Sequence, residues 1–221
     1  MNKIIFSLMA ITVLGPAGAQ AAPILPTSYD MLNGEVGSYE YFDDSYSGSG
    51  NPLVALSPLS GGLGDLTDGV VATQNWDVVE PPPGPGPYVG WSSINPTIRF
   101  HFDAGTNIDQ IDFYFDDSEY GGVYAPGSVD VGASNHPIAD PAGTDPFLFS
   151  LDGLGMTNVT TLDITINRRD VAINGKIWVF VSEIDFYGSS GGGTGNVPEP
   201  AVLALFGLGL AGLGFVRKRR S

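Results

Sequence analysis

The sequence predicts an all-β protein built as an antiparallel β-sandwich of the jelly-roll type. Apolar and polar residues alternate with a period of two through much of the chain between residues 22 and 189, which is the pattern of strands with one buried face. Turn-forming pairs such as Gly121-Gly122 and Asp152-Gly153 separate these segments. No amphipathic helix is predicted in the same range, and about seven strands without helices favour a sandwich or jelly roll.

The strands follow from the alternation, taken in chain order. The clearest segments are 97–103, 111–115, 161–167 and 177–186. Within each segment the apolar side chains are expected to share one face, which points into the core: Ile98, Phe100 and Phe102; Ile111, Phe113 and Phe115; Leu162, Ile164 and Ile166; Trp178, Phe180, Ile184 and Phe186. Shorter strands are expected at 39–42, 128–131 and 147–151. The proline-rich stretch 80–87 cannot pair in a central strand, so a surface loop is expected there.

The first 21 residues have the layout of a secretory signal peptide. Lys3 supplies a positive charge, residues 4–14 are mostly apolar, and Ala19-Gln20-Ala21 is a small-x-small cleavage site. The apolar run is shorter than the roughly 20 residues that a transmembrane helix needs. We therefore expect export by the Sec machinery and cleavage between Ala21 and Ala22, which leaves one domain at 22–188.

The last residues show a second ordered pattern. A Gly/Ser-rich linker at 189–196 leads to Pro198-Glu199-Pro200, then to an uncharged apolar stretch at 201–216, and finally to the basic cluster 217–220. The basic cluster is expected to stay on the cytoplasmic side of a membrane that the apolar helix crosses. Such a helix is short for a bilayer core of about 30 Å, which suits a transient anchor.

This tail, 197–221, resembles the PEP-CTERM sorting signal of Gram-negative bacteria. The resemblance rests on the Pro198-Glu199-Pro200 motif, the glycine-containing apolar helix and the terminal Arg/Lys cluster, in that order. It implies recognition by an exosortase, a membrane cysteine protease-transpeptidase, and a host that makes extracellular polysaccharide. The protein is then expected to be anchored transiently in the inner membrane and to reach the cell surface or the matrix. A permanent C-terminal anchor is the alternative.

The expected mature chain is strongly acidic. Of 9 basic and 24 acidic residues, five basic residues and one acid lie in the two ends, which leaves 4 basic and 23 acidic residues and a net charge of −19. Such a surface repels nucleic acid and attracts cations, although acidity also serves solubility alone. The chain has no cysteine, so disulfides, thiolate metal sites and cysteine nucleophiles are excluded.

The order of features between residues 38 and 188 resembles the galactose-binding-like jelly roll of discoidin (F5/8 type C) domains and many carbohydrate-binding modules. The residues that carry the resemblance are Leu66-Thr67-Asp68-Gly69, Gly90-Trp91, 96–102, 108–115, 126–129 and 178–184. The absence of the cysteine pair common in discoidin domains, and the unusual loop at 80–87, are departures from the pattern.

Many members of that family bind a structural Ca²⁺ through an early aspartate, neighbouring carbonyls and a glutamate on the last strand. By resemblance these positions correspond to Asp68 and Glu183, and Thr73 could add a hydroxyl. Hard oxygen ligands are those that Ca²⁺ prefers. The alternative is that Asp68 is only a turn residue and Glu183 only an outward strand residue.

Aromatic residues in or beside loops are candidates for stacking on sugar rings. Tyr88, Trp91 and Tyr120 form the predicted ligand site, although most aromatics in such a domain belong to the core. The acidic run 116–119 and the pair Asp43-Asp44 lack a supporting catalytic motif, so solvated turns are the better interpretation.

The sequence therefore predicts a non-catalytic exported protein that binds extracellular polysaccharide or another extracellular ligand. A structural matrix or biofilm protein without a soluble ligand is the alternative. An exported glycan hydrolase is the third and least favoured hypothesis.

Overall fold

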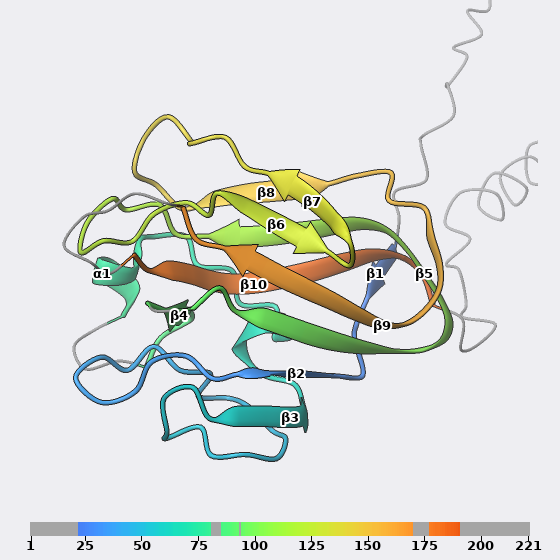
Figure 1. The fold of residues 1–221 in the computed structure, drawn as a ribbon, viewed down its shortest axis with the longest axis horizontal. Helices are drawn as coiled ribbons and strands as arrows, with labels where there is room; N and C mark the ends of the chain where they lie inside the picture. The colour runs from blue at the N-terminus through green and yellow to red at the C-terminus, as the bar shows by residue number, and fades with distance from the viewer. Residues whose placement is uncertain (1–21, 81–84, 93, 170–176, 191–221) are drawn as a thin grey trace, which may run out of the picture.

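The computed structural model of the chain describes residues 22–80, 85–92, 94–169 and 177–190 (Figure 1). The signal peptide, the linker beyond residue 190 and the sorting tail lie outside these residues. The elements, in chain order, are β1 (Ala22–Ile24), β2 (Ser28–Leu32), β3 (Pro58–Gly62), a 3₁₀ turn η1 (Asp65–Thr67), α1 (Trp76–Val79), β4 (Val89–Trp91), β5 (Thr97–Phe115), β6 (Ser128–Val131), β7 (Ser134–Pro137), β8 (Phe147–Leu151), β9 (Met156–Asn167) and β10 (Val179–Ser189).

The long strand β5 links the two halves of the fold. Its first half pairs with β2 on one side and β9 on the other, while its second half pairs with β10 and β8. The register with β9 shifts between His101 and Thr106, where β5 passes from one half to the other. All ladders between named strands are antiparallel, in the order β1-β10-β5-β9-β6-β7 with β2, β3, β4 and β8 as branches. The fold is thus all-β and antiparallel, as the sequence predicts.

The main core includes most of the side chains that the alternation assigns to it. Ile98, Phe100 and Ile111 are fully buried, and Phe113 and Phe115 stack in parallel with ring centroids 5.8 Å apart. Phe186 of β10 packs edge-on against Phe100, with 4.8 Å between the ring centroids. Burial of this apolar surface is the main stabilisation available to a chain without disulfides.

Strand β10 departs from the single buried face that the sequence predicts. Its register with β5 shifts between Val181 and Glu183, and an extra residue in a strand turns the following side chains to the opposite face. Ile184 belongs to the main core, whereas Trp178 and Phe180 belong to a second, smaller core on the other side of the strand. The prediction that Trp178, Phe180, Ile184 and Phe186 share a face is therefore wrong.

Other strand predictions need smaller corrections. The segments 97–103 and 111–115 are one continuous strand, and residues 39–42 form no strand but only an isolated bridge between Glu35 and Tyr41. The strands at 128–131 and 147–151 have the expected bounds. Short strands β1 to β4 and β7, and the four-residue helix α1, were not expected from the pattern.

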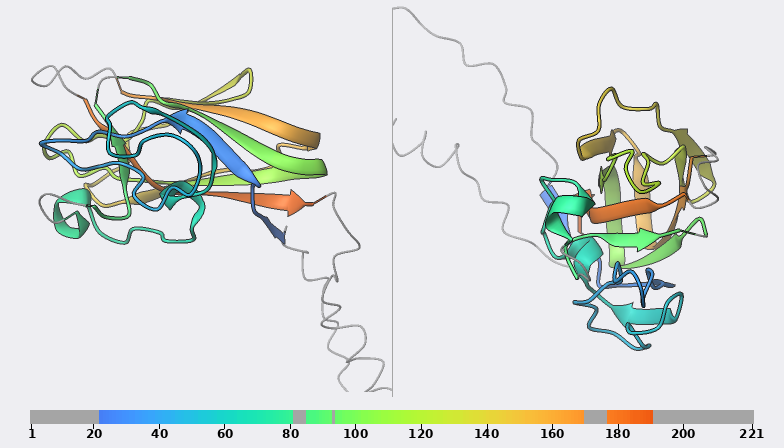
Figure 2. Two further views of the ribbon diagram at one scale, coloured as in Figure 1. Left: turned by 90° about the horizontal axis from the view of Figure 1, so that it is seen from below. Right: turned by 90° about the vertical axis from the view of Figure 1, so that its left-hand side faces the viewer.

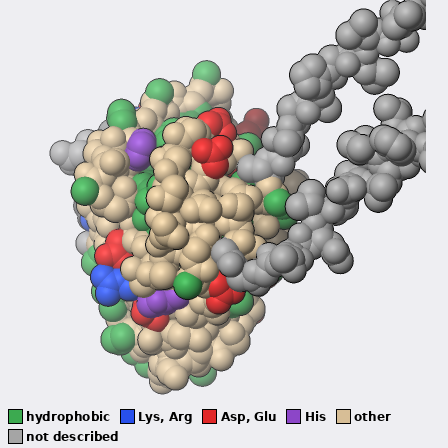
Figure 3. Space-filling view, turned by 90° about the vertical axis from the view of Figure 1, so that its right-hand side faces the viewer, with side chains coloured by type: hydrophobic (Ala, Val, Ile, Leu, Met, Phe, Trp, Pro, Cys, Tyr) green, Lys and Arg blue, Asp and Glu red, His purple; other side chains and the backbone are tan. Residues whose placement is uncertain are grey.

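The two ends of the described domain lie together. Ala22 of β1 pairs with Gly188 of β10, and Figures 1 and 2 place both at the end of the domain opposite α1. Viewed from that end, hydrophobic side chains are scattered and form no continuous apolar surface (Figure 3). Among the residues described, no helix has the length and hydropathy to cross a membrane; the predicted span 201–216 falls outside them.

Candidate functional site

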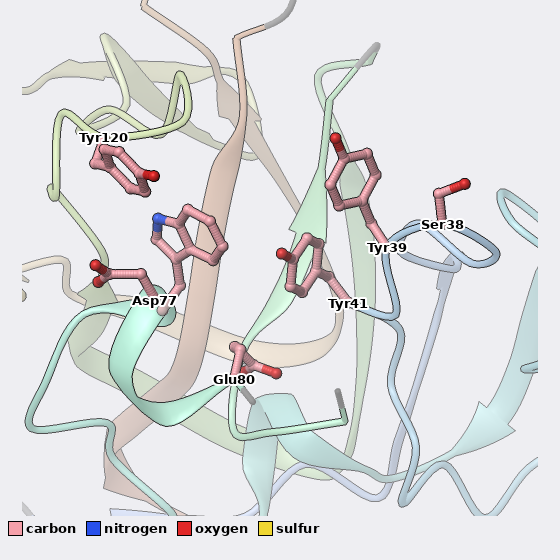
Figure 4. A pocket seen from close by; sticks show the side chains of 7 residues that line it. Ser38, Tyr39, Tyr41, Asp77, Glu80 and Tyr120 are labelled. Atoms are coloured by element: carbon pink, nitrogen blue, oxygen red, sulfur yellow. The ribbon is translucent and has the colours of Figure 1, made fainter. Parts of the chain in front are cut away.

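An open cleft lies beside α1, over the smaller core. It has a volume of about 470 Å³ and adjoins a cavity of about 230 Å³ that shares most of its aromatic lining. We call the two together the aromatic cleft. The described residues that line the larger part are Ser38, Tyr39, Tyr41, Trp76, Asp77, Glu80 and Tyr120 (Figure 4). The adjoining part extends to Gly121, Val123, Trp178 and Phe180.

Exposed aromatic rings form two sides of the aromatic cleft. Tyr120 is 64% exposed and stacks on Trp76, with ring centroids 6.0 Å apart and 15° between the planes. On the other side Tyr39 is 50% exposed and stacks on Tyr41 at 5.9 Å and 21°. Tyr41 in turn meets Trp76 edge-on at 5.7 Å. Each exposed ring is thus supported by a less exposed one, so the cleft presents flat apolar surfaces to solvent.

The smaller core supports these rings from below. Phe180 of β10 is buried and contacts Tyr41, Trp76 and Trp178, with ring centroids 4.7, 5.8 and 5.6 Å away. Residue 90 on the paired strand β4 must be glycine, because a Cβ atom there would overlap the Phe180 ring. The register shift in β10 therefore places Phe180 under the aromatic cleft and not in the main core.

Two hydrogen bonds from the loop after β5 fix Trp76. Its backbone N–H donates to Asp116 Oδ2 at 2.7 Å, and its indole Nε1–H donates to Ser118 Oγ at 2.9 Å. Asp116 also accepts from the Ser118 N–H at 2.8 Å. Since Tyr120 follows in the same loop and stacks on the indole, this loop positions both rings. Asp116 and Asp117 are buried, so the expectation that they lie in solvated turns is wrong.

Glu80 is the buried carboxyl of the cleft. It is 3% exposed, and its Oε1 accepts the Tyr88 N–H at 2.8 Å. Its Oε2 has no hydrogen-bond partner among the described residues. Burial, together with the charges of Asp44 and Asp116, raises the pKa of Glu80 to about 7, because a low-dielectric, negatively charged surrounding disfavours the carboxylate.

Of the three predicted ligand residues, Tyr120 alone lies in the aromatic cleft with an exposed ring. Tyr88 and Trp91 are fully buried. The Tyr88 ring belongs to the smaller core and its hydroxyl donates to the Gln74 carbonyl, while Trp91 belongs to the main core and its Nε1–H donates to the Leu32 carbonyl. Neither has surface for a sugar to stack on, so the ligand site expected from the sequence loses both residues.

Sequence reasoning did not assign Tyr39, Tyr41, Trp76 or Glu80 to a site. The segment with Tyr39 and Tyr41 was expected to be a strand, and Glu80 was placed in a surface loop. A signal was nevertheless present, since Trp76 was among the aromatics beside loops and three aromatic residues at 39–42 precede an acidic pair.

The predicted metal residues are only partly brought together. Gly69 donates its N–H to Glu183 Oε2 at 3.1 Å, and Ala72 donates to Ser182 Oγ at 3.2 Å, so the loop that begins at Asp68 lies against β10. Asp68 itself accepts the Val70 N–H at 2.8 Å. Thr73 is exposed beyond this loop. In the described ranges no group of three or more His, Cys, Asp or Glu side chains is arranged to hold a metal ion.

The electrostatics of Glu183 favour a neutralising partner. The side chain is 2% exposed, and burial together with the neighbouring carboxylates of Asp185 and Asp68 raises its pKa to about 8. Two carboxylates beside the backbone of a loop have the oxygen donor type that Ca²⁺ takes. The residues therefore fit an oxygen-ligated cation in type, although the protein supplies two charged ligands and no third.

Comparison with protein families gives one match: residues 196–220 match the model of the PEP-CTERM protein-sorting motif. The sorting-tail prediction is thereby confirmed, and the motif implies an exported protein that an exosortase sorts. A comparison with curated proteins gives no significant match.

Eight chains of solved structures match this chain, including the following two. One is the F5/8 type C domain of a Bacteroides fragilis protein, with 10% identity and a TM-score of 0.42 over 78% of this chain and 99% of that one. The other is the CBM32 domain of AlyQ in complex with 4,5-unsaturated mannuronic acid, with 13% identity and a TM-score of 0.29 over 46% of this chain and 78% of that one. At these TM-scores neither likeness bears on what this chain binds.

Proposed function

We propose that this chain is an exported, non-catalytic protein that binds carbohydrate through the aromatic cleft. The observation that carries the proposal is the pair of exposed rings, Tyr120 and Tyr39, held on opposite sides of one cavity by stacking on Trp76 and Tyr41. Exposed aromatic side chains supply large flat contact areas with little loss of entropy, and a hydroxyl at the edge. The apolar face of a pyranose packs on such a surface, while its hydroxyls reach the polar groups of the rim.

Binding should be weak for a single site. The aromatic cleft is open and shallow, so one or two sugar rings would make few contacts. We expect dissociation constants of tens to hundreds of micromolar, which is about −5 to −6 kcal/mol.

A glycan array followed by calorimetry tests the proposal. Both are carried out on the protein in the form that is purified after expression and export. Tyr120→Ala and Tyr39→Ala should each weaken binding to the best glycan by about tenfold or more. Leu148→Ala is the matched control, because Leu148 is also 50% exposed but lies on β8 outside the cleft. No heat with millimolar sugar would favour the structural-matrix alternative. Equal affinities in all three variants would contradict binding through the aromatic cleft.

The same preparation tests the hydrolase hypothesis. Incubation with the glycan that binds best, followed by product analysis, should show no cleavage. Product formation above a buffer blank would contradict the non-catalytic assignment.

The sorting tail bears on where this binding takes place. We propose that an exosortase cuts near Pro198-Glu199-Pro200, so that the mature protein lacks 201–221 and ends at the cell surface or in the polysaccharide matrix. The match to the sorting motif supports this proposal. Intact-mass measurement on protein from the native host decides it, and a mass that includes 201–216 would instead mean a permanent anchor.

We also propose that a structural Ca²⁺ is held by Asp68, by Glu183 and by carbonyl oxygens of the loop that begins at Asp68 and packs against β10. Thr73 would supply a more remote hydroxyl. The close approach of that loop to Glu183 supports this proposal. Such an ion would join the early loop to the last strand and would neutralise two carboxylates in a domain that has few cations.

A further inference from the structure

The aromatic cleft is acidic and has no basic side chain in its described lining. Asp77 and Glu80 line it, and the carboxylates of Asp44 and Asp116 are close enough to Glu80 to raise its pKa. Within the described lining, an anionic ligand would therefore meet only acidic side chains, whereas a cationic group would be attracted by Asp77 and Glu80.

The arginines of the described residues are engaged elsewhere. Arg99 forms a bidentate pair with Asp163 at 2.7 and 2.8 Å. Arg168 donates to the carbonyls of Ser92 and Ile177. Arg169 donates to the carbonyls of Ala125, Pro126 and Ile138 and pairs with Asp140. None of them is placed to receive a sugar carboxylate in the aromatic cleft.

Oε2 of Glu80 lacks a hydrogen-bond donor among the described residues. A buried acceptor without a partner destabilises the folded protein, and Oε2 is such an acceptor within the described structure. Its companion Oε1 is already occupied by the Tyr88 N–H, so the carboxyl is held in place with one oxygen left over. Figure 4 shows the Glu80 side chain near Tyr41, at the edge of the space between Tyr120 and Tyr39.

The rings add an attraction for positive charge. A cation over the face of Trp or Tyr within about 6 Å of its centroid is stabilised by the ring quadrupole, and more strongly when it is desolvated. The aromatic cleft offers the faces of Tyr39 and Tyr120 beside a buried carboxyl. The combination suits a ligand that carries both an apolar ring face and an ammonium group.

We propose that the aromatic cleft recognises an amino sugar with a free amino group, whose ammonium donates to Glu80 Oε2 while its pyranose face packs on the Trp76–Tyr120 side. This inference rests on the proposed carbohydrate-binding function and names its ligand class. N-acetylation removes the charge and adds bulk at the atom that would meet Glu80. A uronic acid is disfavoured because its carboxylate would meet no basic side chain in the described lining of the cleft.

Calorimetry with three oligosaccharides of equal length tests the assignment: a glucosamine oligomer, an N-acetylglucosamine oligomer and a galacturonate oligomer, at neutral pH and physiological salt. The glucosamine oligomer should bind about tenfold more tightly than the acetylated one, and the galacturonate oligomer should give no heat. Glu80→Gln should remove the preference for the free amine. Asp77→Asn, at an exposed position, should reduce it by a smaller factor and guards against misfolding of the buried variant.

Two controls separate recognition from attraction to a negatively charged protein. Tyr120→Ala should weaken glucosamine binding, whereas Asp152→Asn, which removes an exposed charge in the turn after β8, should not. Choline should bind much more weakly than the oligomer. Equal affinity for choline, persistence of binding in Tyr120→Ala, or equal affinity for the acetylated oligomer would overturn the amino-sugar assignment. If no sugar of any class binds, the proposed function itself fails.

Discussion

Replacement of Glu183 by glutamine should make the stability of the domain less dependent on pH. Glu183 is buried and its pKa in the folded protein is about 8, against about 4.3 for an unfolded glutamate. Between these values the folded protein holds a proton that the unfolded chain has lost, so stability is fully present below about pH 4 and declines until the pH passes about 8.

The size of the effect follows from the proton count. One proton of difference costs about 1.4 kcal/mol for each pH unit, so a rise from about pH 5.5 to about pH 7.5 costs roughly 2.7 kcal/mol from this group. For a domain of this size that is about 5–11 °C in melting temperature, at 2–4 °C per kcal/mol. Glutamine retains an oxygen that accepts the Gly69 N–H, which Glu183 accepts at 3.1 Å, but it does not ionise.

The assay is thermal unfolding of both proteins in EDTA across this pH range. The wild type should melt several degrees lower at the higher pH, and the Glu183→Gln variant should lose about a third of that change. It should not lose all of it, because burial raises the pKa of Asp65 and Glu80 to about 7 and that of Asp43 to about 6. Parallel curves for the variant and the wild type would refute the reasoning, and Asp152→Asn provides an exposed control.

Three further results are expected. Adding millimolar Ca²⁺ after EDTA should raise the melting temperature of the wild type by several degrees, since binding at a hundredfold excess over the dissociation constant contributes about 2.7 kcal/mol. Mg²⁺ should not substitute for Ca²⁺, and Asp68→Ala should abolish the response. An unchanged wild-type melting temperature would exclude the ion. Ser118→Ala should release the indole of Trp76, which costs about 1 kcal/mol of stability, lowers sugar affinity and shifts the fluorescence of this half-buried tryptophan. A spectrum identical to the wild type would contradict the positioning role. Gly90→Ala should destabilise the domain by about 1–3 kcal/mol because its Cβ would displace Phe180, and denaturant unfolding that shows no loss would mean that the ring moves freely.

The sequence was sufficient to predict the strands that bury one face. Ile98, Phe100 and Phe113 alternate with polar residues and are fully buried, because the period of two and the burial of apolar area specify the same faces. The sorting tail was equally accessible, since Pro198-Glu199-Pro200 and its apolar and basic neighbours are read from the chain itself.

The aromatic cleft was not predictable in the same way. Its support depends on the register shift after Val181, and a bulge is set by pairing with β5, which lies more than 60 residues away in the chain. Alternation through 177–186 placed Phe180 in the main core, whereas the bulge sends it to the opposite side. Tyr88 was predicted to be a ligand residue because of its glycine and proline neighbours. It directly precedes β4, however, and its ring packs against that of Phe180, with 6.0 Å between the centroids. Tertiary pairing decides these cases, and local composition does not.

The pairing of Ala22 with Gly188 has a consequence for how the protein works while it is still tethered. Both ends of the domain lie on the side opposite α1 (Figure 1). A membrane anchor in the sorting tail would therefore be connected to the domain on the side opposite the aromatic cleft. A membrane-held copy would then present its binding end outward, into the surrounding polymer. Removal of the tail would change where the protein with its bound carbohydrate can diffuse. Its affinity for the carbohydrate would be the same before and after cleavage.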